Sequence, residues 1–178
     1  MTLAPDVAMM VRARLRDIPD FPRPGVVFKD ISPVLADPAA FRAVVDGLAL
    51  RALASGADIL AGIEARGFLL AAAAAYATGR GVVPLRKPGK LPGQTLDQSY
   101  SLEYGETSLH LQVDALREGV RVLIIDDVLA TGGTAVAAHS LVTRTGAHVA
   151  GIAVLLELEF LGGRRRVGDL PVTALLVE

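Results

Sequence analysis

The stretch VLIIDDVLATGGT, residues 122–134, decides the fold of this chain. It opens with four branched apolar residues, continues with Asp126 and Asp127, and ends in a turn of small residues. An apolar run of this length before a turn predicts a buried strand of a parallel sheet. Because charge is costly to desolvate, the two acids are either solvated at the end of a strand or part of a ligand site.

The composition narrows the class of protein. The 178 residues are most simply one domain, residues 1–178, with 52% hydrophobic and only 4% aromatic residues, hence an aliphatic core. A net charge of −1 with mixed signs gives no field for nucleic acid or an anionic membrane, so we expect neither as a partner. The absence of cysteine excludes disulfides and zinc–thiolate sites.

Targeting and membrane segments are not expected. The N-terminus lacks an uninterrupted apolar region of the signal-peptide type. The longest apolar run, GFLLAAAAAYA from Gly67, is far shorter than the ~18 residues of a membrane span. A soluble protein of the reducing cytoplasm fits these features.

Strand-like and helix-like segments alternate along the chain. A short N-terminal helix from Val7 to about Leu15 is followed by a proline-rich extended loop over residues 18–33. We then expect helices over 38–54, from the residues after EARG (64–67) to Thr78, and over 133–145. Strands are expected over 57–63, 81–86, 122–127, 148–158 and 171–178, and basic loops over 87–95 and 162–169. Residues 99–105 and 106–116 alternate and suggest an antiparallel pair. This order predicts an α/β fold with a mainly parallel central sheet flanked by helices.

Asp126 and Asp127 are expected at the carboxyl edge of that sheet, where ligands of open α/β folds bind. The turn that follows leads into a helix, so its backbone N–H groups can face an anion. Two carboxylates beside a phosphate cradle suit a ribose 5-phosphate, with Mg²⁺ between them as one option. A Walker-type NTPase is not favoured, because no G-x-x-x-x-G-K-[ST] occurs, and GRGVVP from Gly79 lacks the dinucleotide fingerprint.

Five motifs together resemble one family. The stretch 122–134 is similar to the phosphoribosyl pyrophosphate (PRPP) motif of type I phosphoribosyltransferases. DFPRPGVVFKDISPVL, GIEARGFL, RKPGKLPG and SLEYG resemble, in this order and spacing, the adenine-specific members. The resemblance implies a small N-terminal base-binding hood, a flexible antiparallel lid and a homodimer. It also implies transfer of ribose 5-phosphate from PRPP to adenine, giving AMP and pyrophosphate in purine salvage, with Mg²⁺ bound through PRPP rather than by the protein.

The resemblance assigns roles on the PRPP side of the site. Asp126 and Asp127 would bind the ribose hydroxyls, and Arg66 would bind pyrophosphate, although it could be a surface cation. The 5-phosphate would be wrapped by Ala130, Thr131, Gly132, Gly133 and Thr134.

The lid and the base site follow by the same match. Glu103 would lie near N7 of adenine as a catalytic acid, unless it is only an exposed carboxylate. The lid residues expected around pyrophosphate are Arg86, Lys87, Lys90 and Tyr104. The adenine site would be formed by Val27, Phe28, Lys29 and Val128. Phe28 could instead pack in the core, Lys29 replaces the arginine of many relatives, and Arg164–Arg166 are expected to be solvated.

Two alternatives remain open from the sequence. A sister transferase acting on hypoxanthine, guanine, xanthine or a pyrimidine would share the PRPP motif. A non-catalytic PRPP-sensing regulator would need a nucleic-acid module, and neither a basic N-terminal extension nor aromatic stacking platforms occur.

Overall fold

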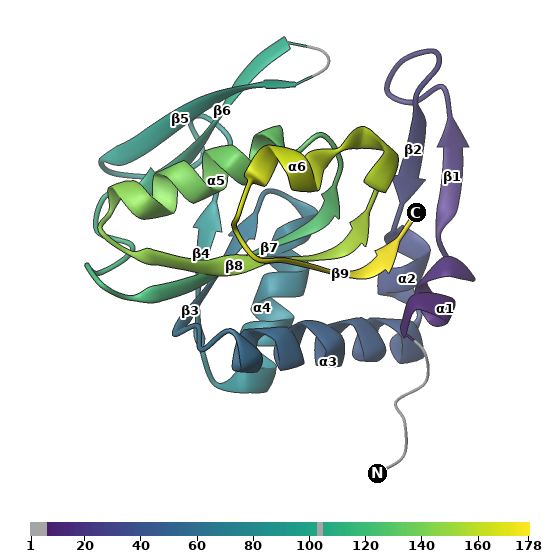
Figure 1. Ribbon diagram of the computed structural model, residues 1–178, viewed down its shortest axis with the longest axis horizontal. Coiled ribbons are helices and arrows are strands. Elements are labelled where there is room, and N and C mark those ends of the chain that lie inside the picture. The colour runs from purple at the N-terminus through teal and green to yellow at the C-terminus, as the bar shows by residue number, and fades with distance from the viewer. Residues whose placement is uncertain (1–6, 103–104) are drawn as a thin grey trace.

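A parallel sheet of five strands forms the centre of the molecule (Figure 1). The computed structural model describes residues 7–102 and 105–178. Its strands stand in the order β4-β3-β7-β8-β9 and are parallel throughout. They are β3 (Ile59–Ile63), β4 (Gly81–Leu85), β7 (Arg121–Leu129), β8 (His148–Glu157) and β9 (Val172–Val177). The predicted α/β class with a mainly parallel sheet is confirmed.

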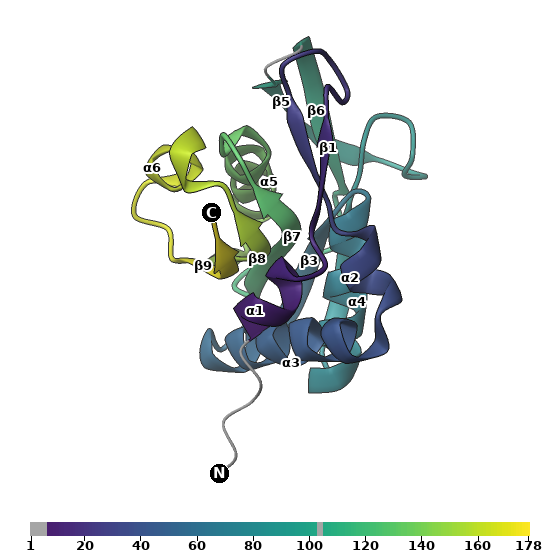
Figure 2. The same cartoon turned by 90° about the vertical axis from the view of Figure 1, so that its right-hand side faces the viewer.

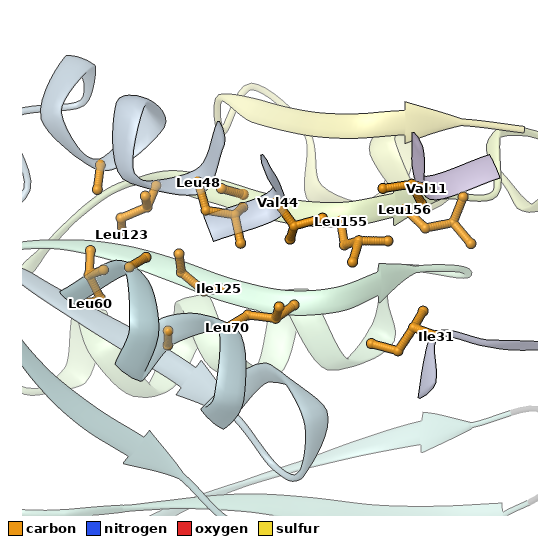
Figure 3. Close-up of a cluster of buried hydrophobic side chains, with 14 of the residues drawn as sticks. Val11, Ile31, Val44, Leu48, Leu60, Leu70, Leu123, Ile125, Leu155 and Leu156 are labelled. Atoms are coloured by element: carbon orange, nitrogen blue, oxygen red, sulfur yellow. The ribbon is translucent and has the colours of Figure 1, made fainter. Parts of the chain in front are cut away.

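Both faces of the sheet are covered by helices. Helices α3 (Pro38–Ala54) and α4 (Arg66–Thr78) lie on one face, and α5 (Gly133–Arg144) lies on the other (Figure 2). Because side chains alternate along a strand, Leu123 and Ile125 of β7 join the α3–α4 cluster (Figure 3), whereas Val122 and Ile124 join the α5 cluster. A strand buried on both faces explains why residues 122–125 are all apolar.

The direction in which successive strands are added to the sheet reverses between β3 and β7. From β3 it passes through α4 to β4 on one side, whereas from β7 it passes through α5 to β8 on the other. The carboxyl ends of β3 and β7 therefore form the topological switch point, where open α/β sheets bind ligands. β3 pairs with β7 only as far as Ile125, so the next two residues of β7, Asp126 and Asp127, lie beside the loop that leaves β3.

Helix boundaries follow the sequence signals closely. The Asp37 carboxylate accepts hydrogen bonds from the backbone N–H groups of Ala39 (3.0 Å) and Ala40 (2.8 Å), so it caps α3 as predicted. Gly79 ends α4 in the left-handed conformation, with φ of 66°. The predicted N-terminal helix is shorter, α1 (Val7–Arg12), and α2 (Ser32–Ala36) precedes α3.

The proline-rich segment is more ordered than an extended loop. It contains an antiparallel hairpin of β1 (Arg16–Pro19) and β2 (Val27–Asp30). Pro22 and Pro24 lie in the connection, outside the paired register, and Pro19 ends its strand, so no proline interrupts the ladder. The prolines therefore shape the turn rather than prevent pairing.

Two further segments differ from expectation. The basic stretch 162–169 is not a plain loop, because it contains α6 (Gly163–Val167), which follows a 3-10 turn η1 (Glu159–Leu161). The antiparallel pair is present as β5 (Thr95–Leu102) and β6 (Gly105–Gln112), with β5 beginning four residues earlier than expected, at Thr95 rather than Ser99. Both hairpins rise above the sheet, at opposite sides in Figure 1.

Within residues 7–102 and 105–178, no helix has the length and apolar character that crossing a membrane requires.

Candidate active site

The turn after β7, residues 130–134 and hereafter the phosphate loop, leads directly into α5. The N-cap of α5 is Gly132, and among residues 7–102 and 105–178 no side chain caps the first turn. Helix α3, in contrast, has its first amides satisfied by Asp37. The free N–H groups and the positive end of the α5 dipole therefore remain available for an anion.

Close packing from α6 fixes the path of the phosphate loop. Gly132 has φ of +81°, and a Cβ there would lie 2.7 Å from the carbonyl oxygen of Gly163. A Cβ on Gly163 would in turn overlap the carbonyl oxygen of Ala130. Glycine is thus required on both sides of this contact, because no side chain fits between the loop and α6.

Asp127, the second acid, lies next to the start of α4. Asp127 has the parity of Ile125 and is directed to the α4 side, where its Oδ2 lies 2.8 Å from Nε of Arg66. Asp127 is only 6% exposed, and among the described residues its Oδ2 has no hydrogen-bond partner of good geometry. A buried carboxylate oxygen that lacks an aligned donor is suited to accept a ligand hydroxyl.

Asp126 lines the pocket beneath the phosphate loop, and its Oδ1 also lies 3.1 Å from the position that a Cβ on Gly67 of α4 would take. Its Oδ1 accepts the backbone N–H of Asp127 at 2.9 Å. Burial first, and then the neighbouring Asp127 carboxylate, raise the pKa of Asp126 well above its usual range, although Arg66 opposes them. Hydroxyl groups and cations brought by a ligand would favour the charged form of this pair.

The loop that leaves β3 brings a cation to the acids. The Glu64–Ala65 peptide bond is cis, and the N-terminus of α4, like that of α5, has no side-chain cap. Gly67 lets α4 approach β7, since a Cβ there would lie 2.8 Å from the carbonyl oxygen of Ile125. Arg66 is therefore no isolated surface cation: it contacts Asp127 and lies 4.8 Å from the centre of the Phe28 ring.

The β1–β2 hairpin contributes Phe28 to this site. Phe28 is half-buried, makes an edge contact with Phe21 at 5.1 Å between ring centroids, and belongs to neither core cluster. The alternative that Phe28 packs in the core is therefore wrong. Val27 alternates to the other face of the strand and is 52% exposed.

Lys29 is held away from Arg66 and Phe28 by ion pairs. Its Nζ lies 2.9 Å from Asp17 and 2.8 Å from Glu178. Burial lowers the pKa of Lys29, but the two carboxylates outweigh it and leave the pKa above its ordinary value. The side chain thus connects the hairpin to the end of β9, so any contact of Lys29 with a base would come from its backbone.

The loop that follows β4, expected to form part of a lid, is linked to the β3 loop by an ion pair. Nε of Arg86 lies 3.3 Å from Oε2 of Glu64, and the backbone N–H of Lys87 donates to the same oxygen at 2.7 Å. Burial raises the pKa of Glu64, but these donors prevail and hold it below the usual value. Arg86 also donates to the carbonyl oxygen of Lys90 at 3.0 Å. Glu103 and Tyr104 lie outside the described residues.

Tyr100 is a site residue that sequence reasoning missed. It lies on β5, and its hydroxyl hydrogen-bonds with the side chain of Thr134. Burial first, and then the nearby Asp126, raise its pKa despite that hydrogen bond. The alternation of β5 puts Gln98 on the same face, and there its Oε1 accepts the hydroxyl of Ser140 of α5 at 2.8 Å.

A small pocket beneath the phosphate loop completes the site. It is lined by Asp126, Val128, the whole phosphate loop and apolar residues of β3 and β8. In the part of the chain that the structure describes, no group of three His, Cys, Asp or Glu side chains is placed to hold a metal ion.

Comparison with known proteins gives the same assignment along most of the chain. Residues 34–172 match the phosphoribosyl transferase domain family. A Frankia casuarinae protein named adenine phosphoribosyltransferase is 59% identical over 170 residues, 96% of this chain and 90% of the relative. The crystal structure of the Thermoanaerobacter pseudethanolicus adenine phosphoribosyltransferase has a TM-score of 0.93 and 46% identity, covering 96% of this chain and 99% of that one. The Saccharomyces cerevisiae enzyme, complexed with an imino-altritol bisphosphate and adenine, has a TM-score of 0.90 and 37% identity, covering 96% and 98%.

Proposed function

This chain belongs to the phosphoribosyl transferase family, and from that premise we propose how it makes AMP and pyrophosphate from adenine and PRPP in purine salvage. The observation that carries the proposal is the switch point between β3 and β7. There the uncapped α5 N-terminus lies next to Asp127, whose buried oxygen has no aligned partner among the described residues. This arrangement suits a sugar phosphate, with the phosphate on the loop and the diol on the acids.

The chemical step asks mainly for positioning. The bond between C1 and the pyrophosphate oxygen breaks through an oxocarbenium-like state, while N9 of adenine attacks from the opposite face. Asp126 and Asp127 hold the ribose hydroxyls, and their negative charge favours the cationic ribosyl centre. Arg66, with the free amides of α4, holds the departing pyrophosphate.

Adenine is placed against the β1–β2 hairpin. Phe28 and Val128 form apolar walls, and backbone groups of Val27 and Lys29 at the free edge of the hairpin match the N6 donor and the N1 acceptor. Glu103 would protonate N7 in the reverse reaction.

The lid and the metal have supporting roles. Arg86, Lys87, Lys90 and Tyr104 would cover the pyrophosphate and exclude water, so that PRPP is not hydrolysed. The Mg²⁺ would enter with PRPP, because among the described residues no cluster of three possible ligands occurs, and Mg²⁺ commonly binds through one or two carboxylates plus phosphate oxygens. We place this domain, residues 1–178, in the cytoplasm.

A panel of bases tests the proposed function. Purified protein with PRPP and Mg²⁺ should convert adenine to AMP and release pyrophosphate, detected by chromatography. Hypoxanthine and guanine should react far more slowly, because a 6-oxo base presents an acceptor and an N1–H and so inverts the hydrogen bonds. Equal rates with hypoxanthine would favour the sister-transferase alternative, and no turnover of any base would favour a PRPP-sensing regulator.

We further propose a homodimer formed through α4. Beyond Arg66 this helix carries no charged residue, and its outer face exposes Leu69 (54%) and Tyr76 (92%). A helix that is apolar on all sides is normally buried, so a second copy of the chain is the occupant that we expect. Since α4 begins at Arg66, such an interface would adjoin the site.

Charge on the outer face of α4 should break the dimer. The double variant Leu69→Glu/Tyr76→Glu is expected to elute as a monomer in size-exclusion chromatography with light scattering, since burying two carboxylates without partners is prohibitive. Leu53→Glu on α3, at a site 54% exposed, is the matched control and should remain dimeric. A wild-type monomer, or a dimer that survives both glutamates, would contradict this interface.

Removing the Lys29 ammonium should weaken adenine binding selectively. Lys29→Met is expected to raise the KM for adenine by about threefold to fivefold, the scale of a partly exposed ion pair, with the KM for PRPP unchanged. Glu178→Gln, which loses the same link between the hairpin and β9, should reproduce the effect, whereas Asp17→Asn within the hairpin should not. A rise in both KM values would show that Lys29 does not act on the base alone.

A further inference from the structure

A buried carboxylate outside the substrate site lies directly behind the phosphate loop. Glu157 ends β8, is only 3% exposed, and stands opposite Leu129 in the sheet register. Leu129 is the last residue before the loop, and its carbonyl oxygen accepts the backbone N–H of Leu158 at 2.9 Å. Glu157 has no place in the chemistry described above.

Arg164 of α6 is the partner of this carboxylate. Its Nε donates to Oε1 of Glu157 at 2.9 Å, and its second terminal nitrogen pairs with Oε2. The remaining nitrogen donates to the carbonyl oxygen of Val172 on β9 at 2.7 Å. One guanidinium thus connects α6 to two strands. Its bidentate contact with Glu157 fixes the orientation of the two side chains as well as the distance between them.

Helix α6 contacts the phosphate loop on its other side. Gly163 packs against Ala130 and Gly132 so closely that a Cβ on either glycine would collide with backbone. A helix of five residues has little stability of its own, so its position depends on tertiary contacts. The Glu157–Arg164 pair is one of these contacts, beside the packing of Val167 against the α5 cluster.

Stability alone does not explain this pair. Burying a carboxylate is costly, and apolar residues of similar size commonly stabilise a fold as well as a buried ion pair does. A forked ion pair differs from an apolar contact in fixing where α6 sits along the loop. That position matters where backbone amides must meet phosphate oxygens at hydrogen-bond distance.

We propose that Glu157 and Arg164 are positioning residues for PRPP: their ion pair presses Gly163 of α6 onto the phosphate loop and so sets the spacing of the loop amides. This inference rests on the proposed function and adds to it two residues that touch no substrate. The effect should be confined to the phosphoribosyl side, because the base lies against the β1–β2 hairpin.

Two mild variants test the proposal. Arg164→Lys keeps the positive charge but cannot make the bidentate contact with the carboxylate. Glu157→Gln keeps the shape of the side chain but loses its negative charge. Each should raise the KM for PRPP by about tenfold, as expected when catalytic groups are slightly misplaced, with the KM for adenine unchanged. The dissociation constant for ribose 5-phosphate, measured by calorimetry, should rise in parallel. Arg165→Met, on the same helix but outside the pair, is the control and should match the wild type.

The outcomes separate positioning from simple stability. A lower melting temperature with unchanged KM values and unchanged ribose 5-phosphate affinity would overturn the proposal, as would an equal rise in both KM values. An effect of Arg165→Met as large as that of Arg164→Lys would overturn it as well. If the wild type failed to make AMP, the proposed function would fail, whereas the calorimetric comparison would still decide the role of the pair.

Discussion

Asp127→Asn should lower kcat by about a hundredfold to a thousandfold, the scale seen when one preorganised group that stabilises transition-state charge is removed. The Asp127 carboxylate is 6% exposed and lacks an aligned hydrogen-bond partner among the described residues, so an incoming ribose hydroxyl finds a strong acceptor there. Asparagine keeps the shape but loses the negative charge that favours the ribosyl cation. Steady-state AMP formation measures the effect.

The fold should survive this change. The melting temperature of Asp127→Asn should stay close to that of the wild type, because Arg66, the ion-pair partner of Asp127, remains about one-third exposed to solvent. Asp114→Asn, at an exposed acid between β6 and β7, serves as the control and should leave kcat unchanged. A kcat of Asp127→Asn within threefold of the wild type would remove Asp127 from the account.

Gly132→Ala should weaken PRPP binding strongly, with a rise of about a hundredfold in the KM for PRPP, as expected from a displacement of about 1 Å. At a φ of +81° the new Cβ would lie 2.7 Å from the carbonyl oxygen of Gly163, so the loop or α6 must move. The amides at the start of α5 would move with it. Initial rates at varied PRPP and fixed adenine give the measurement.

Gly119→Ala separates this clash from simple backbone strain. Gly119 has a similar φ of +77°, but a Cβ there meets nothing within 4 Å. The control should therefore lose only about 1 kcal/mol of stability, the cost of alanine in the left-handed region, with unchanged kinetics. If Gly132→Ala behaved like Gly119→Ala, close packing of the phosphate loop would not matter for PRPP.

Local signals predicted the core of the fold. The apolar run 122–125 predicted that β7 is buried. Asp37 and Pro38 marked the start of α3, and Gly79 marked the end of α4. These features depend on period and capping, which act over a few residues. The same is true of the phosphate loop, whose strand–turn–helix context is visible in the sequence.

Features that depend on distant partners were not predictable in the same way. Arg164 is exposed, as expected, but the sequence did not reveal that it also pairs with a buried carboxylate seven positions earlier once β8 and α6 come together. Lys29 forms an ion pair with Glu178, at the other end of the sequence. The hairpin of β1 and β2 was hidden because prolines outside the paired residues dominate its composition.

The resemblance placed residues in the site that spacing alone could not bring together. Phe28, Arg66 and Asp127 come from a hairpin, a helix start and a strand end, yet Arg66 contacts both of the others. Tyr100 shows the limit of motif matching, since it belongs to the lid strand and reaches Thr134 of the phosphate loop. Its neighbours on the strand, rather than any motif, reveal its direction.

A crystal structure with AMP bound tests the central claim most directly. The account predicts the phosphorus atom within the amides of residues 131–134, the two ribose hydroxyls on Asp126 and Asp127, and the adenine ring beside Phe28. AMP bound elsewhere, or with its phosphate remote from the α5 N-terminus, would contradict the account.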